Sequence, residues 1–321
     1  MNATLRALAA LAFAVSLQAA AQGYPSKPLR VVVGFPAGGP IDIVARILGP
    51  KLSEVSGQQV IVDNRAGANG MIGADLVAKA APDGYTMILI STGTAAINPH
   101  LYPKMPYDPQ NDLAAVTLVT STPELLVVHP SVPAKSVKEL IALAKARPGE
   151  ITIASTGSGG LPHLAQELLK QEAKVNMLHV PFNGAAPAVT NAVGGQVMGL
   201  IADLPVLQPH VVSGRLRALA IAAPKRSPLF PDLPTMGEQG LPHVQAVNWY
   251  GIVTTAKTPP EAIAKLNELF ARTLNDPDVK QKLVARGADP IPGTPAEFAA
   301  FLKSEYSKWG PIAKASGAKV D

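Results

Sequence analysis

Hydrophobic residues in the first third of the chain form short runs that alternate with stretches of helical spacing. The predicted strands are residues 29–35, 60–62 and 87–90, and the predicted helices are residues 41–55 and 71–80. The strand runs are apolar and rich in β-branched residues, which is typical of buried parallel strands. Pro50 inside the first helix predicts a kink or a break there. This β-α-β-α-β rhythm predicts an open α/β sheet.

The same rhythm restarts in the middle of the chain. The predicted strands are residues 125–128, 151–153, 177–180, 199–201 and 216–221, and the predicted helices are residues 137–146 and 164–169. A Pro-rich stretch follows at residues 224–234, and three helical segments end the chain at 260–274, 279–286 and 296–309. The pattern therefore predicts two α/β units, the second ending before the Pro-rich stretch. It does not tell where the C-terminal helices pack.

The composition supports two folded domains. The chain has 321 residues, of which 47% are hydrophobic and 16% are charged, so general disorder is excluded. Cysteine is absent, which excludes disulfides, thiolate nucleophiles and thiolate metal sites. The net charge is only +5 and the basic residues are spread singly, so we expect no nucleic-acid partner.

Residues 1–21 have the pattern of a secretory signal peptide. Arg6 supplies a short basic region, an apolar stretch follows it, and small residues end at Ala21, where we expect cleavage. The apolar run is too short for a membrane anchor, since a span needs about 20 apolar residues. We therefore expect a soluble exported protein, located in the periplasm of a Gram-negative cell.

Three turns of small residues, each followed by a Pro near the start of a helix, are the most informative feature. They are residues 35–42 (FPAGGPID), 155–162 (STGSGGLP) and 181–187 (PFNGAAP). Gly38 and Gly39 can adopt positive φ and expose N–H groups, and Asp42 can fold back onto the free N–H groups of the first turn. Helix N-termini beyond the carboxyl ends of strands favour anions. The alternative is that these turns are plain connectors between strand and helix.

Common catalytic and nucleotide-binding motifs are missing. No phosphate-binding loop is present, and the turn around Gly157 fails both the dinucleotide-binding and the nucleophile-elbow patterns. The six histidines do not have the spacing of a zinc site, so we expect no metal.

A few polar and aromatic side chains leave two interpretations open. His163 and His179 adjoin the second and third turns, where they either brace the cleft by hydrogen bonds or contact a ligand. Asp203 follows an apolar strand and either caps a helix or reaches into a cleft. Trp249 and Trp309 are interpreted as packing residues rather than a stacking platform.

A series of short motifs resembles one known family over nearly all of the mature chain. The matching stretches are 25–28 (PSKP), 35–42 with Ala45 and Arg46, 62–70 (VDNRAGANG), 82–86 (PDGYT), 156–160 with His163, 179–184 (HVPFNG), 217–220 (RALA), 231–235 (PDLPT) and 258–260 (TPP). Each motif is weak by itself, but their order and spacing are specific. The chain resembles the Bug-type solute receptors, the extracytoplasmic binding components of tripartite tricarboxylate transporters.

The resemblance implies an α/β fold of the two-lobed periplasmic binding protein type, with a ligand cleft between lobes joined by hinge strands. Residues 22–122 and 224–321 would form lobe 1, which would then carry the C-terminal helices, and residues 123–223 would form lobe 2. The implied ligand is a small carboxylate, and the implied partner is the membrane permease of the transporter. We expect no cofactor and a monomer.

The family pattern also implies a set of cleft residues. From lobe 1 these are Phe35, Pro36, Ala37, Gly38, Gly39, Asp42, Ser91 and Thr92, and from lobe 2 Thr156, Gly157, Ser158, Gly160, His179, Phe182, Asn183, Gly184, Ala185 and Asp203. Asn183 stands where many members of the family have Lys, so a charge pair with a ligand is missing at that position.

Three functions are compatible with this reading. The first is a periplasmic receptor that closes on a dicarboxylate, tricarboxylate or aromatic acid and delivers it to a permease. The second is a receptor that presents its ligand to a membrane sensor. The third is a secreted enzyme acting on a small acid, with His163 or His179 as a base near Ser158, although no nucleophile–base pair is evident.

Overall fold

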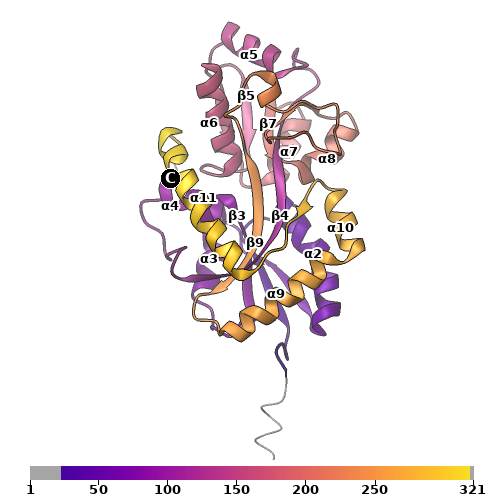
Figure 1. Cartoon of the computed structure of the whole chain (residues 1–321). Coiled ribbons are helices and arrows are strands. Elements are labelled where there is room, and N and C mark those ends of the chain that lie inside the picture. The colour runs from indigo at the N-terminus through magenta and orange to yellow at the C-terminus, as the bar shows by residue number, and fades with distance from the viewer. Residues whose placement is uncertain (1–22, 319–321) are drawn as a thin grey trace, which may run out of the picture.

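The computed structural model describes residues 23–318, so the expected signal peptide at residues 1–21 lies outside the described residues. Two sheets flanked by helices lie one above the other along the molecule, and two long strands run between them (Figure 1). Within residues 23–318, no helix combines the length and the apolar character that crossing a membrane requires.

The lower sheet in Figure 1, sheet A, is mixed parallel and antiparallel. Its strands are β1 (Leu29–Val33), β2 (Val60–Asn64), β3 (Thr86–Ser91), β9 (Val247–Thr255), the first part of β4 (Leu113–Val128) and β10 (Asp289–Pro290). β1 pairs in parallel with both β2 and β3, while β9 runs antiparallel to β3 and to β4. The run of valines in β1 is buried because helices cover both faces of this sheet.

Helices from both ends of the chain cover sheet A. One face packs against α2 (Pro40–Ser56), α9 (Pro260–Asn275) and α10 (Pro277–Val284). The other packs against η1 (Ala68–Gly70), α3 (Met71–Ala78), η2 (Gly93–Ile97), α4 (Asn98–Leu101) and α11 (Pro295–Ala315). Side chains define two of the helix starts: Asp276 caps α10, and Thr294 forms a capping box with Glu297 at α11.

The upper sheet, sheet B, has a parallel centre and an antiparallel edge. β5 (Thr152–Ser155) lies in parallel between β6 (Leu178–Pro181) and β7 (Gly199–Asp203). The end of β4 runs antiparallel to β7 and to β8 (Arg217–Ile221). The helices of this half are α5 (Val137–Ala146), α6 (Leu161–Ala173), α7 (Ala185–Val193) and α8 (Leu204–Val212), with η3 (Gly237–Gln239) on the returning segment.

The chain crosses between the sheets twice. Residues 113–123 of β4 pair with β9 in sheet A, and residues 124–128 continue into sheet B. On the return, Ala246 donates to the carbonyl of Ala222 and accepts from the N–H of Glu124, immediately before β9. Residues 224–246 stay with sheet B, because Met236 donates to the carbonyl of Ile221 and Phe230 packs on the core below β8.

Most predicted elements are present, but helices η2, α4, α7 and α8 had no predicted range, and three further differences concern α2, β4 and β9. Helix α2 does not break at Pro50, since buried Leu48 and Leu52 on either side hold it against the sheet. The first part of β4 and all of β9 were missed by the sequence analysis. Both segments mix polar with apolar residues, and β9 contains Gly251, where an added Cβ would lie 2.2 Å from the ring of Phe298.

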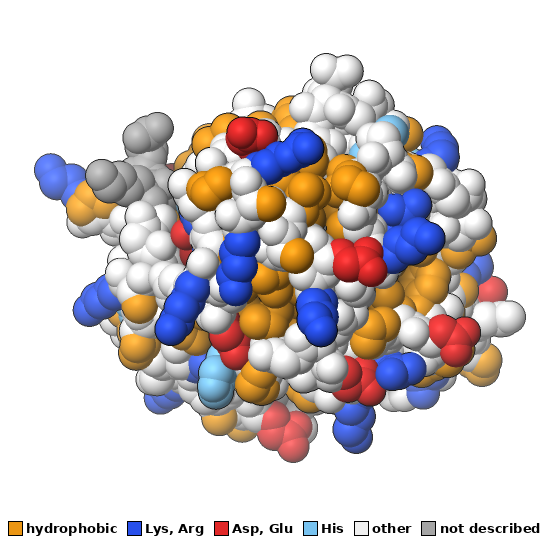
Figure 2. Space-filling view, turned by 90° about the horizontal axis from the view of Figure 1, so that it is seen from above, with side chains coloured by type: hydrophobic (Ala, Val, Ile, Leu, Met, Phe, Trp, Pro, Cys, Tyr) orange, Lys and Arg blue, Asp and Glu red, His pale blue; other side chains and the backbone are white. Residues whose placement is uncertain are grey.

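Charged groups are interspersed on the surface. On the face seen in Figure 2, Lys and Arg side chains lie among Asp, Glu, apolar and uncharged atoms. This distribution agrees with the lack of a basic run in the sequence.

Candidate functional site

A cavity lies where the two sheets meet, and we call it the inner cavity. It is lined by Phe35, Pro36, Gly39, Pro40, Ile41, Asn69, Ser91, Gly93, Thr156, Gly160, Leu161, Pro162, Ala185, Asp203, Asn248 and Tyr250. A wider opening, the outer cleft, shares Phe35, Pro36, Asn69 and Thr156 with it. All three predicted turns border this space, which lies at the carboxyl ends of β1, β5 and β6.

The first turn is held by a buried carboxylate. Asp42 is 2% exposed, and its Oδ2 accepts from the N–H of Gly38 at 2.9 Å and from Nε of Arg46 at 2.8 Å. Its Oδ1 accepts from the amide of Asn64 at 2.9 Å. Burial would raise the pKa of Asp42, but the hydrogen bonds from Arg46, Gly38 and Asn64 outweigh it and lower the pKa. Asp42 therefore shapes the turn from behind and does not line the cavity.

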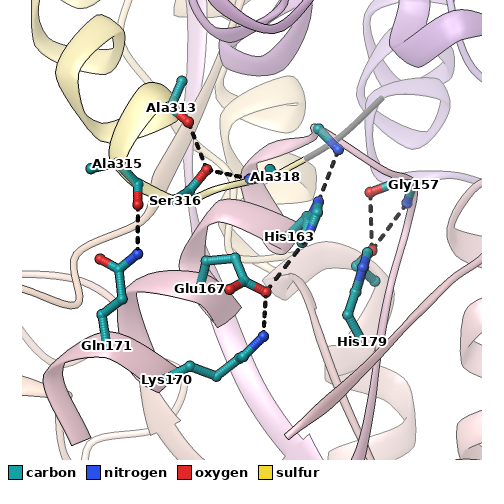
Figure 3. A network of polar contacts seen from close by, with 12 residues as sticks. Gly157, His163, Glu167, Lys170, Gln171, His179, Ala313, Ala315, Ser316 and Ala318 are labelled. Carbon is teal, nitrogen blue, oxygen red and sulfur yellow. Dashed lines mark hydrogen bonds and ion pairs between the residues drawn. The ribbon is translucent and has the colours of Figure 1, made fainter. Parts of the chain in front are cut away.

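The second turn is held by an imidazole. The N–H of Gly159 donates to Nδ1 of His163 at 3.0 Å, and the ring of His163 stacks on that of His179 with centroids 3.7 Å apart (Figure 3). Nε2 of His179 lies 2.6 Å from the hydroxyl of Ser155, which donates to the carbonyl of Gly157. Burial, followed by the neighbouring His163, lowers the pKa of His179 to about 4.

These contacts favour the bracing interpretation of both histidines. Nδ1 of His163 is occupied as an acceptor, and Glu167 lies 3.7 Å from its Nε2. Within residues 23–318, the Ser158 hydroxyl makes no hydrogen bond to either histidine, so the nucleophile–base pair required by the enzyme hypothesis is not assembled.

The two sides of the cleft touch at its mouth. The third turn is tied to the second by the N–H of Gly184, which donates to the carbonyl of Thr156 at 3.2 Å. An added Cβ at Gly184 would lie 3.0 Å from the ring of Pro36 on the opposite side, and one at Gly160 would lie 3.3 Å from Oδ1 of Asn69. The turns from sheets A and B are therefore packed against each other.

A group of buried polar side chains on β3, β4, β7 and β9 adjoins the inner cavity, and Ser91, Asp203, Asn248 and Tyr250 of this group line it. We call this group the polar floor, and it consists of Ser91, Thr120, Thr122, Glu124, Asp203, Asn248 and Tyr250. Oδ1 of Asp203 accepts from Thr122 at 3.0 Å, from the amide of Asn248 at 2.8 Å and from the hydroxyl of Tyr250 at 2.9 Å. Burial raises the pKa of Asp203 despite these bonds, and it raises the pKa of Glu124 well above its usual range.

Asp203 thus reaches into the cavity. It occupies the N-cap position of α8, but its side chain makes no capping hydrogen bond there. The capping alternative for its side chain is wrong, because the donors on β4 and β9 hold the carboxylate toward the floor.

The structure gathers most of the predicted site residues. Phe35, Pro36, Gly39, Ser91, Thr156, Gly160, Ala185 and Asp203 line the inner cavity, and Gly157, Ser158, Phe182, Asn183 and Gly184 line the outer cleft. Ala37, Gly38, Asp42, Thr92 and His179 line neither space. Thr92 is fully buried and its hydroxyl accepts from the N–H of Trp249 at 3.1 Å. Contact of any of these residues with a ligand stays a prediction.

Several lining residues escaped the sequence analysis. They are Asn69, Gly93, Leu161, Pro162, Asn248 and Tyr250, whereas Pro40 and Ile41 belong to the predicted turn 35–42. Pro162 was noted only near a helix start, and Asn248 and Tyr250 lie on the missed strand β9. Among the described residues, no Lys or Arg lines either space and no group of acidic residues and histidines has the arrangement of a metal site.

Two α/β halves, joined by crossing strands around a central cavity, define a solute-binding protein of the two-lobed periplasmic type. Comparison with known proteins identifies the family within this class. Residues 44–318 match the model of the tripartite tricarboxylate transporter family receptor. The chain therefore belongs to this family of Bug-type periplasmic solute-binding proteins, as the motifs predicted.

Relatives with names and structures support the assignment. Protein BugT of Bordetella pertussis is 38% identical over 309 residues, which cover 95% of this chain and 94% of BugT. The structure of R. palustris Rpa4515 with adipate has a TM-score of 0.90 and 35% identity, covering 92% of this chain and 99% of that one. MatC from Rhodopseudomonas palustris with bound malate has a TM-score of 0.85 and 34% identity, covering 90% and 100%.

Proposed function

We propose that this protein captures a small carboxylate in the inner cavity by hinge closure and delivers it to the permease of a tripartite tricarboxylate transporter. The observation that carries this proposal is the meeting of three helix N-termini at one cavity. Pro40 of α2, Leu161 of α6 and Ala185 of α7 all line it, and each begins its helix. Helix N-termini offer free N–H donors and a positive dipole end, which stabilise an anion without any basic side chain.

The relatives point to the same chemistry. Two proteins similar to this chain hold adipate and malate, which are both carboxylates. In this chain, Phe35, Ile41 and Leu161 add apolar surface to the cavity, which suits the carbon chain of an organic acid.

The crossing strands are the natural hinge for closure. We propose that the lobe of sheet A comprises residues 23–122 and 247–318, and that the lobe of sheet B comprises residues 123–246. This boundary follows the contacts of residues 224–246, which stay with sheet B until the chain enters β9. Domain closure about a few crossing residues belongs to the usual repertoire of binding proteins.

A binding screen tests the function. The mature chain from residue 22 is unfolded, refolded to remove bound ligand and screened by thermal shift against mono-, di- and tricarboxylates and aromatic acids. A ligand at 100 times its dissociation constant stabilises the folded state by about 2.7 kcal/mol. Selective stabilisation by one class of acid supports the proposal, and a flat response to all of them contradicts it.

A pair of neighbouring substitutions tests the site. Ala185→Asp places a carboxylate at the start of α7 inside the cavity, where it competes with the ligand for the same N–H groups. We expect the ligand-induced shift to be lost. Ala186→Asp puts the same charge on the next, exposed residue and is the matched control. If both variants bind normally, the carboxylate does not lie at these helix ends.

A further inference from the structure

The polar floor contains two carboxyl groups, those of Asp203 and Glu124, whereas the residues other than Asp203 that line the inner cavity are uncharged. On β4, Thr120 and Thr122 are register partners of Tyr250 and Asn248 on β9, and Glu124 is the partner of Asp203 on β7. Directly opposed residues of antiparallel strands project to the same face of a sheet. Tyr250, Asn248 and Asp203 line the inner cavity, so Glu124 projects to the same face of the sheet as these residues, buried behind Asp203 and outside the lining itself.

Glu124 is the most unusual residue of this floor. It is fully buried, and neither oxygen of its carboxyl group has a hydrogen-bond partner within residues 23–318. The hydroxyl of Thr120 is buried and unpaired in the same way. Buried polar groups are nearly always paired in native proteins, so an unpaired carboxyl beside a ligand cavity points to a partner that enters with the ligand.

The carboxylate of Asp203 calls for a charged donor. Oδ1 of Asp203 already accepts three hydrogen bonds, none of them from a charged group. The described residues that line the inner cavity and the outer cleft include no Lys and no Arg that could neutralise Asp203. A carboxylate buried without a cation is costly, and a cationic group from the ligand would remove that cost.

We propose that the ligand of this protein is bipolar, with a carboxylate held by the helix N-termini and an ammonium group at its other end held by the polar floor. This inference rests on the proposed function and narrows it to a class of substrate, the amino-terminated monocarboxylates. A dicarboxylate of the same length would place its second carboxylate against the carboxylate of Asp203, where like charges repel. The relatives that hold adipate and malate support only the carboxylate end of this assignment.

Matched pairs of probes test the inference. Isothermal titration of the refolded mature chain compares 5-aminopentanoate with adipate and 4-aminobutanoate with glutarate, each pair differing only in the terminal group. Pentanoate, which has no second polar group, is the reference. We expect each amino acid to bind at least about tenfold more tightly than its dicarboxylate and than pentanoate, which corresponds to about 1.4 kcal/mol.

Substitutions in the polar floor test whether its carboxyl groups cause the preference for the amino acid over the dicarboxylate. Asp203→Asn keeps an oxygen acceptor for the three donors but removes the charge, so the preference for the amino acid should fall to within about threefold. Glu124→Gln should reduce the preference to a smaller extent, and it keeps the test valid if Asp203→Asn does not fold. Asp278→Asn removes one carboxylate from the exposed surface of α10 and should leave the preference unchanged.

Each outcome has a separate meaning. If a dicarboxylate binds as tightly as its amino acid partner or more tightly, the inference is overturned while the proposed function stands. The same holds if the preference survives unchanged in both floor variants. If no acid of any kind binds, the proposed function itself fails.

Discussion

The two Gly-rich turns that face each other across the cleft have the same backbone but different supports. Gly39 and Gly160 both precede a helix that starts with a Pro in its first turn, and their φ/ψ values are −75°/167° and −77°/169°. In the turn from sheet A the supporting group is the carboxylate of Asp42, whereas in the turn from sheet B it is the imidazole ring of His163.

The difference shows how one backbone shape can be stabilised by two kinds of chemistry. The Asp42 carboxylate accepts from Arg46 as well as from Gly38, so this support persists wherever the carboxylate stays ionised. The turn from sheet B is supported by His163, whose ring stacks on His179, and burial lowers the pKa of His179 and favours its neutral form. The turn from sheet A should therefore be insensitive to mild acid, and the turn from sheet B should be sensitive to it.

Removing the charged support should have the largest effect. Asp42→Ala leaves the N–H of Gly38 and the amide of Asn64 without their acceptor. Hydrogen bonds to charged groups contribute roughly 1.5–3 kcal/mol, so we expect the free energy of unfolding to fall by about 2 kcal/mol in urea titrations of the unliganded protein. Asp278→Ala, at an exposed site, should change it by less than about 0.5 kcal/mol. Equal losses in the two variants would contradict a supporting role for Asp42.

Acidification should separate the two turns. The pKa of His179 is lowered to about 4 in the folded protein, against an ordinary value of 6.5, so the unfolded chain binds the proton first as the pH falls. The stability that this residue contributes is complete above pH 6.5 and is lost progressively toward pH 4. Between pH 7 and pH 5 we expect a loss of roughly 1–2 kcal/mol.

A variant without an ionisable group at position 179 tests whether His179 causes this loss of stability. His179→Gln keeps a polar group near Ser155 but cannot be protonated, so urea titrations between pH 7 and pH 5 should show a smaller loss than in the parent protein. The pKa of Asp42 is lowered, so its contribution is lost only at more acidic pH and Asp42→Ala should keep the parent's pH dependence. An unchanged loss in His179→Gln would show that other groups are responsible.

The smallest expected effects come from alanine substitutions at Gly39 and Gly160, because the added methyl groups meet different neighbours. An added Cβ at Gly39 would lie 3.3 Å from the carbonyl oxygen of Pro36 in its own turn, whereas one at Gly160 would lie 3.3 Å from Asn69 on the other side of the cleft. Gly39→Ala should therefore lower the stability of the unliganded protein slightly. Gly160→Ala should leave that stability unchanged but weaken ligand binding by a factor of about three, as measured by titration calorimetry. The reverse pattern would argue against contact across a closing cleft.

The sequence predicted the turns and most of the helices because these are local features. Gly and Pro at fixed offsets specify the turns, and apolar periodicity specifies helices such as α9. The sequence analysis missed β9 and the first part of β4, because polar residues such as Thr122 and Asn248 break the apolar pattern of these strands. Asn248, Tyr250 and Glu124 join the site only through strand pairing, which no local pattern contains.

Sheet A is completed by pairing segments from the two ends of the chain. Within residues 23–318, the edge of β3 that faces away from β1 is covered by β9, through partners such as Met87 and Thr254. Forming these pairs means closing a loop that contains all of sheet B, and such non-local contacts slow folding because the entropy of the loop is lost first. Until residue 247 is available, the edge of β3 remains a template for pairing with another molecule. A chain that stops short of β9 should therefore aggregate, even though it carries all of sheet B and all three Gly-rich turns.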